Sequence, residues 1–301
     1  MLPGNLQYLR RKQVDTVKWD QCIDKAPNGL IYACSFYLDH LVPNWDALVL
    51  GDYEAVMPLP WRKKFGVRYL YHPAFTQQLG VFSQTGLNDG LVAMFMDRLS
   101  AHFPYAEMLL NYAHPAKGMS QRSNYVLSLQ EPYEQIRARY KNDLVKNLKR
   151  ANRFPLSYSD EVDQQLVLET YKEFYGSRTP HVRGEDYTRF EKLCTFLSKG
   201  STVVRAVKEE GRLLSAILLL RHNNRMYLLA SVTWPAGRSR EANHFLLDRV
   251  LHEFAGINLV LDFEGSDLPG VAHFYKNFGG IDQPYFFYRY NKLPWWIRWM
   301  K

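Results

Sequence analysis

The stretch Leu261-Asp-Phe-Glu-Gly-Ser266, followed by Pro269-Gly-Val-Ala-His-Phe-Tyr-Lys-Asn-Phe-Gly-Gly280, decides how the C-terminal half of this chain folds. Its first part ends a predicted strand over residues 257–263, which is apolar on both faces, as a strand inside a sheet would be. Because side chains alternate along a strand, Asp262 and Glu264 share one face. Burial of two repelling carboxylates would raise the pKa of one into the range of a general base. The structural alternative is that both pair with arginine or cap the next turn.

The elements before and after this stretch have the order of an α/β domain. A hairpin and a third strand precede a helix, and the helix precedes the strand that ends near Asp262. The predicted elements are helices over residues 163–175 and 185–197, strands over 202–208, 213–221 and 226–233, a helix over 241–255, a short helix over 271–277 and an aromatic strand over 285–290.

The first half of the chain repeats this order of elements, although it does not repeat the letters. Its predicted elements are strands over residues 47–50, 54–59 and 79–82, a helix over 89–102, and strands over 106–111 and 125–129. We therefore predict an α/β (α+β) fold of two tandem domains, residues 1–130 and 131–301. Each would be a mixed, mostly antiparallel sheet flanked by helices.

Composition indicates a folded protein of a reducing compartment. Of 301 residues, 47% are hydrophobic and 23% are charged, which excludes a disordered or fibrous chain. Cys22, Cys34 and Cys194 lack the spacing of a disulfide framework or a zinc ribbon. The start of the sequence lacks the pattern of a secretory signal, and no apolar run reaches the roughly 20 residues of a membrane span. We therefore predict a cytoplasmic protein.

The sequence ends in a tryptophan-rich segment, Pro294-Trp-Trp-Ile-Arg-Trp-Met-Lys301. Tryptophan and lysine suit the interfacial layer of a bilayer. The segment either packs on its own domain or makes a peripheral contact with a membrane.

The stretch Trp234-Pro-Ala-Gly-Arg-Ser-Arg240 joins the third strand to the helix predicted over residues 241–255. A turn of this kind points several backbone N–H groups at one spot, where the helix dipole favours negative charge. The glycine would let a ligand approach the backbone, and either arginine would neutralise a pyrophosphate. The alternative is an ordinary loop whose serine is the N-cap of the helix. The candidate cofactor-binding residues are Gly237, Arg238, Ser239 and Arg240.

Residues 134–154 hold seven basic and two acidic residues, in a chain whose formal net charge is +8. Their spacing predicts one helix with an apolar stripe on one face and a basic stripe on another. Cations on one rigid helix suit a nucleotide-sugar diphosphate or an RNA backbone, whereas a solvated helix face is the usual explanation of such charges. The candidate substrate-binding residues are Arg139, Lys146, Lys149 and Arg150.

His244, Asp248 and His252 recur every four residues along a predicted helix, a spacing compatible with metal binding. The compact two-histidine and glutamate motif of a zinc helix is missing, and Asp248 with His252 makes an ordinary helical pair. We therefore predict no metal site.

The sequence also lacks a Gly-x-Ser-x-Gly motif, a Walker loop and a Rossmann glycine fingerprint, which disfavours a nucleophilic hydrolase.

The element order and the segments over residues 262–266 and 269–280 resemble the Gcn5-related N-acetyltransferase (GNAT) superfamily. A tandem pair of such domains is similar to the Fem-type peptidoglycan-bridge aminoacyltransferases, and Lys146-Asn-Leu-Lys-Arg-Ala151 resembles the opening of their second domain. In the family pattern a lysine stands three residues before the Phe of Phe-Gly-Gly. Here that position is Tyr275, and Lys276 follows it.

The resemblance implies an acyltransferase that moves an acyl or aminoacyl group from a thioester or ester donor to a primary amine by direct attack. The donor would be acyl-coenzyme A or an aminoacyl-tRNA, with no tightly bound cofactor. The acceptor would be an amine-bearing small molecule or a peptidoglycan precursor. Glu264 or Asp262 would be the base, and Tyr275 or Lys276 would lie near the leaving group.

A protein of another class is the alternative. The same GNAT scaffold would then carry a non-catalytic module that binds an anionic polymer, either a nucleic acid or a cell-wall precursor, through its basic helix.

Overall fold

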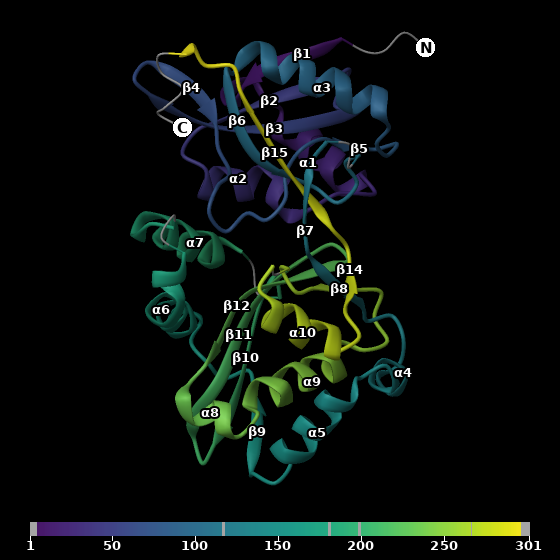
Figure 1. The fold of residues 1–301 in the computed structure, drawn as a ribbon, viewed down its shortest axis with the longest axis vertical. Helices are drawn as coiled ribbons and strands as arrows, with labels where there is room; N and C mark the ends of the chain where they lie inside the picture. The colour runs from purple at the N-terminus through teal and green to yellow at the C-terminus, as the bar shows by residue number, and fades with distance from the viewer. Residues whose placement is uncertain (1–4, 116–117, 180–181, 198–199, 266, 296–301) are drawn as a thin grey trace. The chain divides into compact units, whose positions relative to one another are not determined.

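The computed structural model describes residues 5–115, 118–179, 182–197, 200–265 and 267–295. The chain divides into two compact units, one made of residues 1–122 and 284–301 and the other of residues 123–283. Each unit has its own sheet, flanked by helices (Figure 1). The predicted fold class, two α/β units in tandem, is confirmed.

The first unit contains, within the described residues, one eight-stranded sheet. Its strands lie in the order β1-β2-β3-β4-β6-β15-β7, and β5 pairs with β3. The strands are β1 (Leu6–Arg10), β2 (Trp45–Leu50), β3 (Ala55–Lys64), β4 (Val67–Leu70), β5 (Phe82–Ser83), β6 (Tyr105–Leu110), β7 (Ser120–Arg122) and β15 (Tyr285–Asn291). The helices are α1 (Thr16–Lys25), α2 (Ser35–Leu41) and α3 (Asp89–His102), with short 3-10 helices at Arg11–Gln13 and Ile31–Ala33.

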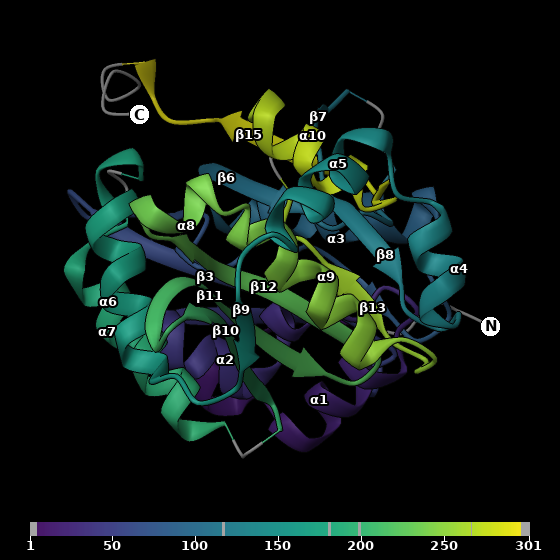
Figure 2. The same cartoon turned by 90° about the horizontal axis from the view of Figure 1, so that it is seen from below.

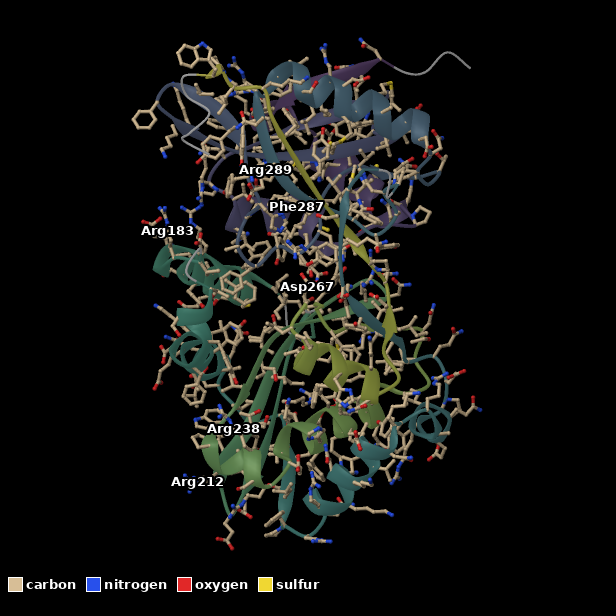
Figure 3. All side chains as sticks on the ribbon, in the orientation of Figure 1. Arg183, Arg212, Arg238, Asp267, Phe287 and Arg289 are labelled. Atoms are coloured by element: carbon tan, nitrogen blue, oxygen red, sulfur yellow. The ribbon has the colours of Figure 1, made fainter. Side chains whose placement is uncertain are left out.

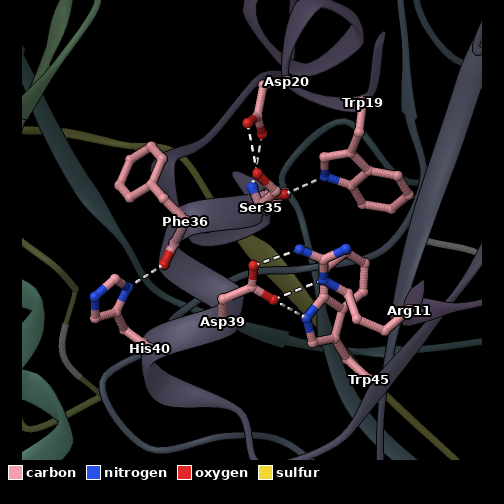
Figure 4. Close-up of polar contacts among 9 residues, drawn as sticks. Arg11, Trp19, Asp20, Ser35, Phe36, Asp39, His40 and Trp45 are labelled. Carbon is pink, nitrogen blue, oxygen red and sulfur yellow. Dashed lines mark hydrogen bonds and ion pairs between the residues drawn. The ribbon is translucent and has the colours of Figure 1, made fainter. Parts of the chain in front are cut away.

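Polar contacts to carboxylates hold α1 and α2 in place (Figure 4). The two carboxylate oxygens of Asp20 accept from the backbone N–H and the hydroxyl of Ser35, each at 2.6 Å, at the start of α2. One turn later Asp39 accepts from the Arg11 guanidinium at 2.7 Å and from the Trp45 indole at 2.9 Å. Because charged hydrogen bonds are stronger than neutral ones, these contacts fix α2 against its neighbours.

The second unit contains, over the residues described for it, one seven-stranded sheet in the order β14-β8-β13-β12-β11-β10-β9. The strands are β8 (Tyr125–Ser128), β9 (Leu156–Ser159), β10 (Thr202–Glu209), β11 (Arg212–His222), β12 (Arg225–Thr233), β13 (Val260–Asp262) and β14 (Ile281–Asp282). The helices are α4 (Tyr133–Ala138), α5 (Asn142–Ala151), α6 (Gln164–Tyr175), α7 (Gly184–Phe196), α8 (Pro235–Ser239), α9 (Ala242–Phe254) and α10 (Pro269–Asn277), with a 3-10 helix at Gly176–Arg178.

Helices cover both faces of this second sheet. Helix α6 packs on β11 and β12, whereas α9 packs on β10 and β11, and Figures 1 and 2 show the two helices on opposite sides of the strands. On the α9 side, Leu247 and Leu251 are buried against Ile217 and Leu219 of β11. Burial of each such side chain contributes about 1.5–3 kcal/mol, so α9 is fixed mainly by its apolar face.

Strands β12 and β13 run parallel but are paired only where both begin. The pairs are Arg225 with Val260, Met226 with Leu261 and Tyr227 with Asp262. Strand β12 then continues to Thr233, whereas β13 ends at Asp262. On its other edge β12 has a register shift against β11, which leaves Leu229 opposite no partner, and such bulges bend a strand. The chain that follows β13, from Phe263 onward, therefore has no pairing with β12 among the described residues.

Two strand pairings correct the predicted domains 1–130 and 131–301. The strand predicted over residues 285–290 is β15, which pairs with β6 and β7 of the first unit. The strand predicted over residues 125–129 is β8, which pairs with β13 and β14 of the second unit. Each strand joins the edge that satisfies its backbone hydrogen bonds, and the order of elements along the chain does not reveal which edge that is.

Other predicted elements are confirmed or shortened. The helix predicted over residues 89–102 coincides with α3, where Asn88 accepts from the backbone N–H of Leu91 at 2.9 Å as N-cap. The hairpin of β10 and β11 is confirmed as well. The predicted strand over 257–263 forms only as β13, and the one over 79–82 is reduced to β5 and an isolated bridge at Leu79.

Two predicted elements differ in kind. The single basic helix predicted over residues 134–154 is divided into α4 and α5, because the backbone of Lys141 is extended between them. The loop predicted over residues 234–240 contains the short helix α8, which begins at Pro235. Proline suits a first helical position because its fixed φ is helical and its missing N–H would be unpaired there.

The tryptophan-rich end of the sequence is described only as far as Trp295, which is 83% exposed. Residues 296–301 lie outside the described residues, so the predicted membrane contact of this segment stays a prediction. None of the helices that the structure describes combines the length and the apolar character of a membrane span.

The strand pairing predicts which fragment of the chain folds. A fragment of residues 123–283 keeps every strand of its sheet, so we expect cooperative thermal unfolding, followed by circular dichroism. A fragment of residues 131–301 lacks the buried Tyr125, Leu127 and Leu129 of the β8 segment, and we expect it to lose about 5 kcal/mol of unfolding free energy. Equal unfolding midpoints for the two fragments would contradict the assignment of β8 to the second unit.

Candidate functional site

A buried ion pair lies where β12 begins and β13 ends. The Nε atom of Arg225 is 2.9 Å from Oδ2 of Asp262, and the Asp262 side chain is fully buried. The other oxygen of Asp262 accepts from the backbone N–H of Glu264 at 3.0 Å. Asp262 is therefore neutralised by arginine and supports the turn that follows. This is the structural role that the sequence left open as an alternative to a general base.

Glu264 has the environment that raises the pKa of an acid. Its backbone is in the left-handed region, with φ of +63°, which turns its side chain out of the strand pattern. The residue as a whole is half-buried, but its Oε1 atom is buried and has no hydrogen-bond partner among the described residues. Burial raises the pKa of Glu264 well above that of an ordinary glutamate. Burial is the cause that the sequence analysis expected for such a shift, and the use of Glu264 as a general base stays a prediction.

Tyr275 of α10 adjoins this acid. Its ring stacks on Phe263, with centroids 4.6 Å apart, and lies 6.3 Å from the ring of Tyr125. Burial raises the pKa of the Tyr275 phenol, and the nearby Tyr171, Glu264 and Asp262 raise it further. Tyr275 therefore keeps its proton at neutral pH and can donate that proton in a hydrogen bond to an anionic partner.

Lys276 lies apart from this group. Its side chain is exposed, and its ammonium is 5.4 Å from the centre of the Tyr125 ring. The structure thus brings Asp262, Glu264 and Tyr275 together, while the contacts described for Lys276 do not join it to them.

Gly237 has a packing role that differs from the predicted one. A Cβ atom at this position would lie 2.1 Å from the carbonyl oxygen of Leu214 in β11. The glycine is buried and allows α8 to approach the strand. Close approach of the protein's own backbone therefore requires glycine here, and ligand binding by Gly237 stays a prediction.

Of the other three candidate residues in this segment, two contact other parts of the protein and one does not. Ser239 donates to the carbonyl of Ala236 at 3.0 Å, and Arg240 pairs with Glu209 at 3.0 Å. Arg238 is exposed, and its side chain makes no hydrogen bond or ion pair with a described residue. Figure 3 shows it beside α8. Arg238 is thus the member of this group that can meet a ligand.

Arg238 borders an open hollow of about 450 Å³ between the end of β12 and the start of α9. Other residues that line it are Tyr175, Thr233, Gly237, Glu241, Ala242, Asn243, His244 and Phe274.

Ser239, which the sequence offered as the N-cap of the following helix, is not the N-cap of α9. That position is Glu241, whose backbone is left-handed with φ of +54°. The Glu241 carboxylate is held by Arg150 at 2.6 Å and by His244 at 3.0 Å.

A second hollow of about 430 Å³ lies between α5, α9 and α10. Its lining residues are Asp143, Lys146, Asn147, Arg150, His244, Gly270, His273, Phe274 and Asn277. Of the predicted basic stripe, Lys146 and Arg150 reach this hollow. Lys149 is exposed elsewhere on α5, and Arg139 pairs with Glu131. His244 and Phe274 line both hollows.

The three residues with metal-compatible spacing contact other side chains of the protein. His244 bonds Asn147 at 2.9 Å as well as Glu241. Asp248 accepts from the hydroxyl of Tyr133 at 2.7 Å, and the ring of His252 lies edge-on to Tyr133. Side-chain contacts, which spacing alone does not show, thus explain this pattern.

The fold and the site define the class of protein. Residues 137–277 match the family model described as "Acetyltransferase (GNAT) domain", and they include α5, the diverging strands β12 and β13, and α10 with Tyr275. This part of the chain is thus similar to a GNAT acetyltransferase domain. No curated protein sequence matches the chain closely enough to extend this statement.

Solved structures extend the likeness over both units. FemX has 12% sequence identity and a TM-score of 0.66, covering 95% of this chain and 98% of its own. A tandem GNAT protein from the clavulanic acid biosynthesis pathway has 10% identity and a TM-score of 0.56, covering 96% of this chain and 99% of its own. A conserved protein from Bacteroides thetaiotaomicron has 9% identity and a TM-score of 0.57, covering 94% and 99%. The predicted resemblance to the GNAT superfamily, in a tandem Fem-like fold, is confirmed.

The close approach of Gly237 to the backbone of Leu214 predicts that adding a methyl group at this glycine strongly lowers stability. We expect Gly237→Ala to lower the free energy of unfolding by about 3 kcal/mol, because its Cβ would overlap the backbone of β11. Gly184→Ala is the matched control, since a Cβ there meets no atom within 4 Å. Urea unfolding of both variants tests this, and equal stability of the two would show that α8 does not need glycine.

The buried acid predicts that stability depends on pH. The native state retains the Glu264 proton above the pKa of about 4.3 at which the unfolded chain loses it, so the wild type loses stability as pH rises toward the raised native pKa. Glu264→Gln removes this loss. We expect the Tm of this variant, measured relative to that of wild type, to rise between pH 4 and pH 8, because only the wild type carries the buried carboxyl with a raised pKa. A difference that stays constant with pH, as expected for the exposed control Glu185→Gln, would contradict burial of this acid.

Proposed function

We propose that the chain transfers an acyl group from an acyl-coenzyme A thioester to a primary amine, with Glu264 as the general base. The observation that carries this proposal is the buried Oε1 atom of Glu264, which has no hydrogen-bond partner among the described residues and lies near Tyr275, just after β13. Strongly perturbed acids in such positions are typical of catalytic sites.

Glu264 would prepare the amine. An amine arrives at neutral pH as an ammonium ion, which cannot attack a carbonyl until it loses a proton. A carboxylate whose pKa is raised by burial is a stronger base than an ordinary one, and it would accept that proton. Such general-base catalysis contributes about 10²- to 10⁴-fold to the rate.

Tyr275 would act on the leaving group of the acyl donor. Its raised pKa keeps the phenol protonated, so it can donate a hydrogen bond or a proton to the leaving group. Lys276, which the resemblance offered as an alternative, points toward Tyr125. The thioester supplies an activated acyl carbonyl when the donor is bound.

The donor would be held in the hollow beside α8 and α9. Arg238 is a cation without a partner in the described part of this hollow, and the first N–H groups of α9 lie at its edge. Glu241 brings a negative charge to the same place, but Arg150 balances it. The residues therefore fit a phosphate-bearing donor, with Arg238 as its main contact.

The acceptor would be an amine that also carries an anionic group. Lys146 lines the second hollow and would bind that group, whereas Arg150 in the same hollow is already paired with Glu241. A peptidoglycan precursor is the acceptor that the Fem-type resemblance implies, and a small amine is the simpler case.

The experiment that tests the proposal begins with donor binding. Native mass spectrometry of the full chain with acetyl-coenzyme A, longer acyl-coenzyme A thioesters and charged tRNA is expected to show a coenzyme A complex. Steady-state transfer to a panel of amines then measures kcat for wild type, Glu264→Gln and the exposed control Glu185→Gln. We expect Glu264→Gln to lower kcat about 100-fold, because the ammonium proton has no acceptor. We also expect the rise of the wild-type rate with pH to be lost in this variant.

Two outcomes would overturn parts of the proposal. Binding of charged tRNA without coenzyme A would replace the donor. Unchanged turnover in Glu264→Gln would remove Glu264 from the role of base. Salt-sensitive retention of RNA with no transfer to any amine would favour the alternative class, a polymer-binding module on the same scaffold.

A further inference from the structure

The turn between β3 and β4 has an unusual residue at its first position. Lys64 pairs with Val67, so Phe65 and Gly66 form a two-residue hairpin turn. Both have positive φ, +50° for Phe65 and +82° for Gly66. This turn type favours asparagine, aspartate or glycine at both positions. A bulky aromatic residue in the left-handed region is an outlier, because its Cβ is crowded by the backbone.

Packing does not compensate the strain at Phe65. Tyr53, another aromatic residue with positive φ (+64°), is buried, and its hydroxyl accepts from the backbone N–H of Asp15 at 2.7 Å. Phe65 is 75% exposed, and the ring contact described for it is the ammonium of Lys64, 5.6 Å from the ring centre. A strained residue that gains no burial indicates a function outside the fold.

The charges on the same hairpin are also unfavourable for folding alone. Residues 55–88 contain four cations and no aspartate or glutamate. Lys63 stands directly opposite Arg68, and like charges at such positions destabilise a hairpin. Arg68 is paired with Asp46 at 3.4 Å, but no ion pair among the described residues involves Lys63 or Lys64. The ammonium of Lys64 lies near the exposed ring, and Lys63 precedes Lys64 in the strand, so the hairpin tip carries two cations without an ion pair among the described residues.

We propose that this hairpin tip, Lys63–Gly66, binds the surface of an anionic lipid bilayer. The interfacial layer of a bilayer accepts an aromatic ring in its apolar part and cations at its phosphates, within a few ångströms of each other. Phe65 enters that layer, and Lys63 and Lys64 contact the headgroups. The bilayer compensates what the fold leaves unfavourable at this turn, namely an exposed ring and unpaired like charges.

This inference is independent of acyl transfer. The hairpin tip belongs to the first unit, whereas Glu264, Tyr275 and Arg238 belong to the second. Loss of membrane binding would therefore leave turnover of a soluble amine unchanged, and loss of Glu264 would leave membrane binding unchanged.

The test is co-sedimentation of the full chain with vesicles of phosphatidylcholine, with and without phosphatidylglycerol. We expect binding to the anionic vesicles that weakens as salt is added. Lys63→Gln with Lys64→Gln is expected to weaken binding about 5-fold per lysine. Phe65→Asn is expected to weaken binding at least several-fold while Tm stays equal or rises, because asparagine suits the positive φ of this turn.

Matched controls separate the hairpin tip from general exposure and charge. Phe196→Asn removes another exposed aromatic ring, 60% accessible at the end of α7. Lys12→Gln with Lys25→Gln removes the same charge elsewhere on the first unit. Both are expected to bind as wild type does. The proposal is wrong if the wild type stays in the supernatant with anionic vesicles, if Phe65→Asn binds equally well, or if Phe65→Asn lowers Tm and so shows that the ring is needed for folding.

Discussion

The buried ion pair between Arg225 and Asp262 is the interaction on which the rest of the second unit's site depends. Arg225 begins β12 and Asp262 ends β13, so the pair fixes the two strands at the point where they begin to diverge. Loss of one partner from a buried pair leaves an uncompensated charge and costs about 3–5 kcal/mol. The second oxygen of Asp262 holds the backbone of Glu264. Asp262, which is paired with Arg225, therefore fixes the backbone position of Glu264, whose Oε1 atom has no hydrogen-bond partner among the described residues.

Sequence patterns predicted the elements well where the information is local. Helix α3 was predicted to its last residue, because Asn88 is an N-cap and the apolar spacing is helical. Glu264 was singled out from strand alternation, although β13 ends at Asp262 and the positive φ of Glu264 departs from that pattern. Long-range contacts could not be predicted in this way. The arginine that pairs with Asp262, the backbone that approaches Gly237 and the glutamate that pairs with Arg150 all come from distant segments. The strands that β8 and β15 pair with are also far from them in the sequence, so these pairings could not be predicted from local patterns either.

The two units share an order of elements but differ in chemistry at corresponding strand ends. In the first unit β6 is followed by Asn111, which donates to the carbonyls of Leu79 and Val81 at 3.1 Å and 2.9 Å. His114 accepts from the backbone N–H of Val81 at 2.9 Å, and burial lowers its pKa to about 4. These neutral side chains are used to hold backbone segments together. In the second unit the strand end carries an acid that no described residue engages. The repeated fold thus has one strand end whose polar side chains bond the backbone and one that carries the buried acid proposed as the base.

The exchange of strands also sets an order for folding during synthesis. Domains of most multidomain chains fold from the N-terminus as they leave the ribosome. Here the first unit cannot complete its sheet until β15 is made, after all of residues 123–283. At about 5–20 residues per second this takes roughly 10–30 s. The second unit already contains β8 and all its other strands by then. The half of the chain that emerges first is therefore the half that finishes folding last, and its β6 edge needs protection from other nascent chains in the meantime.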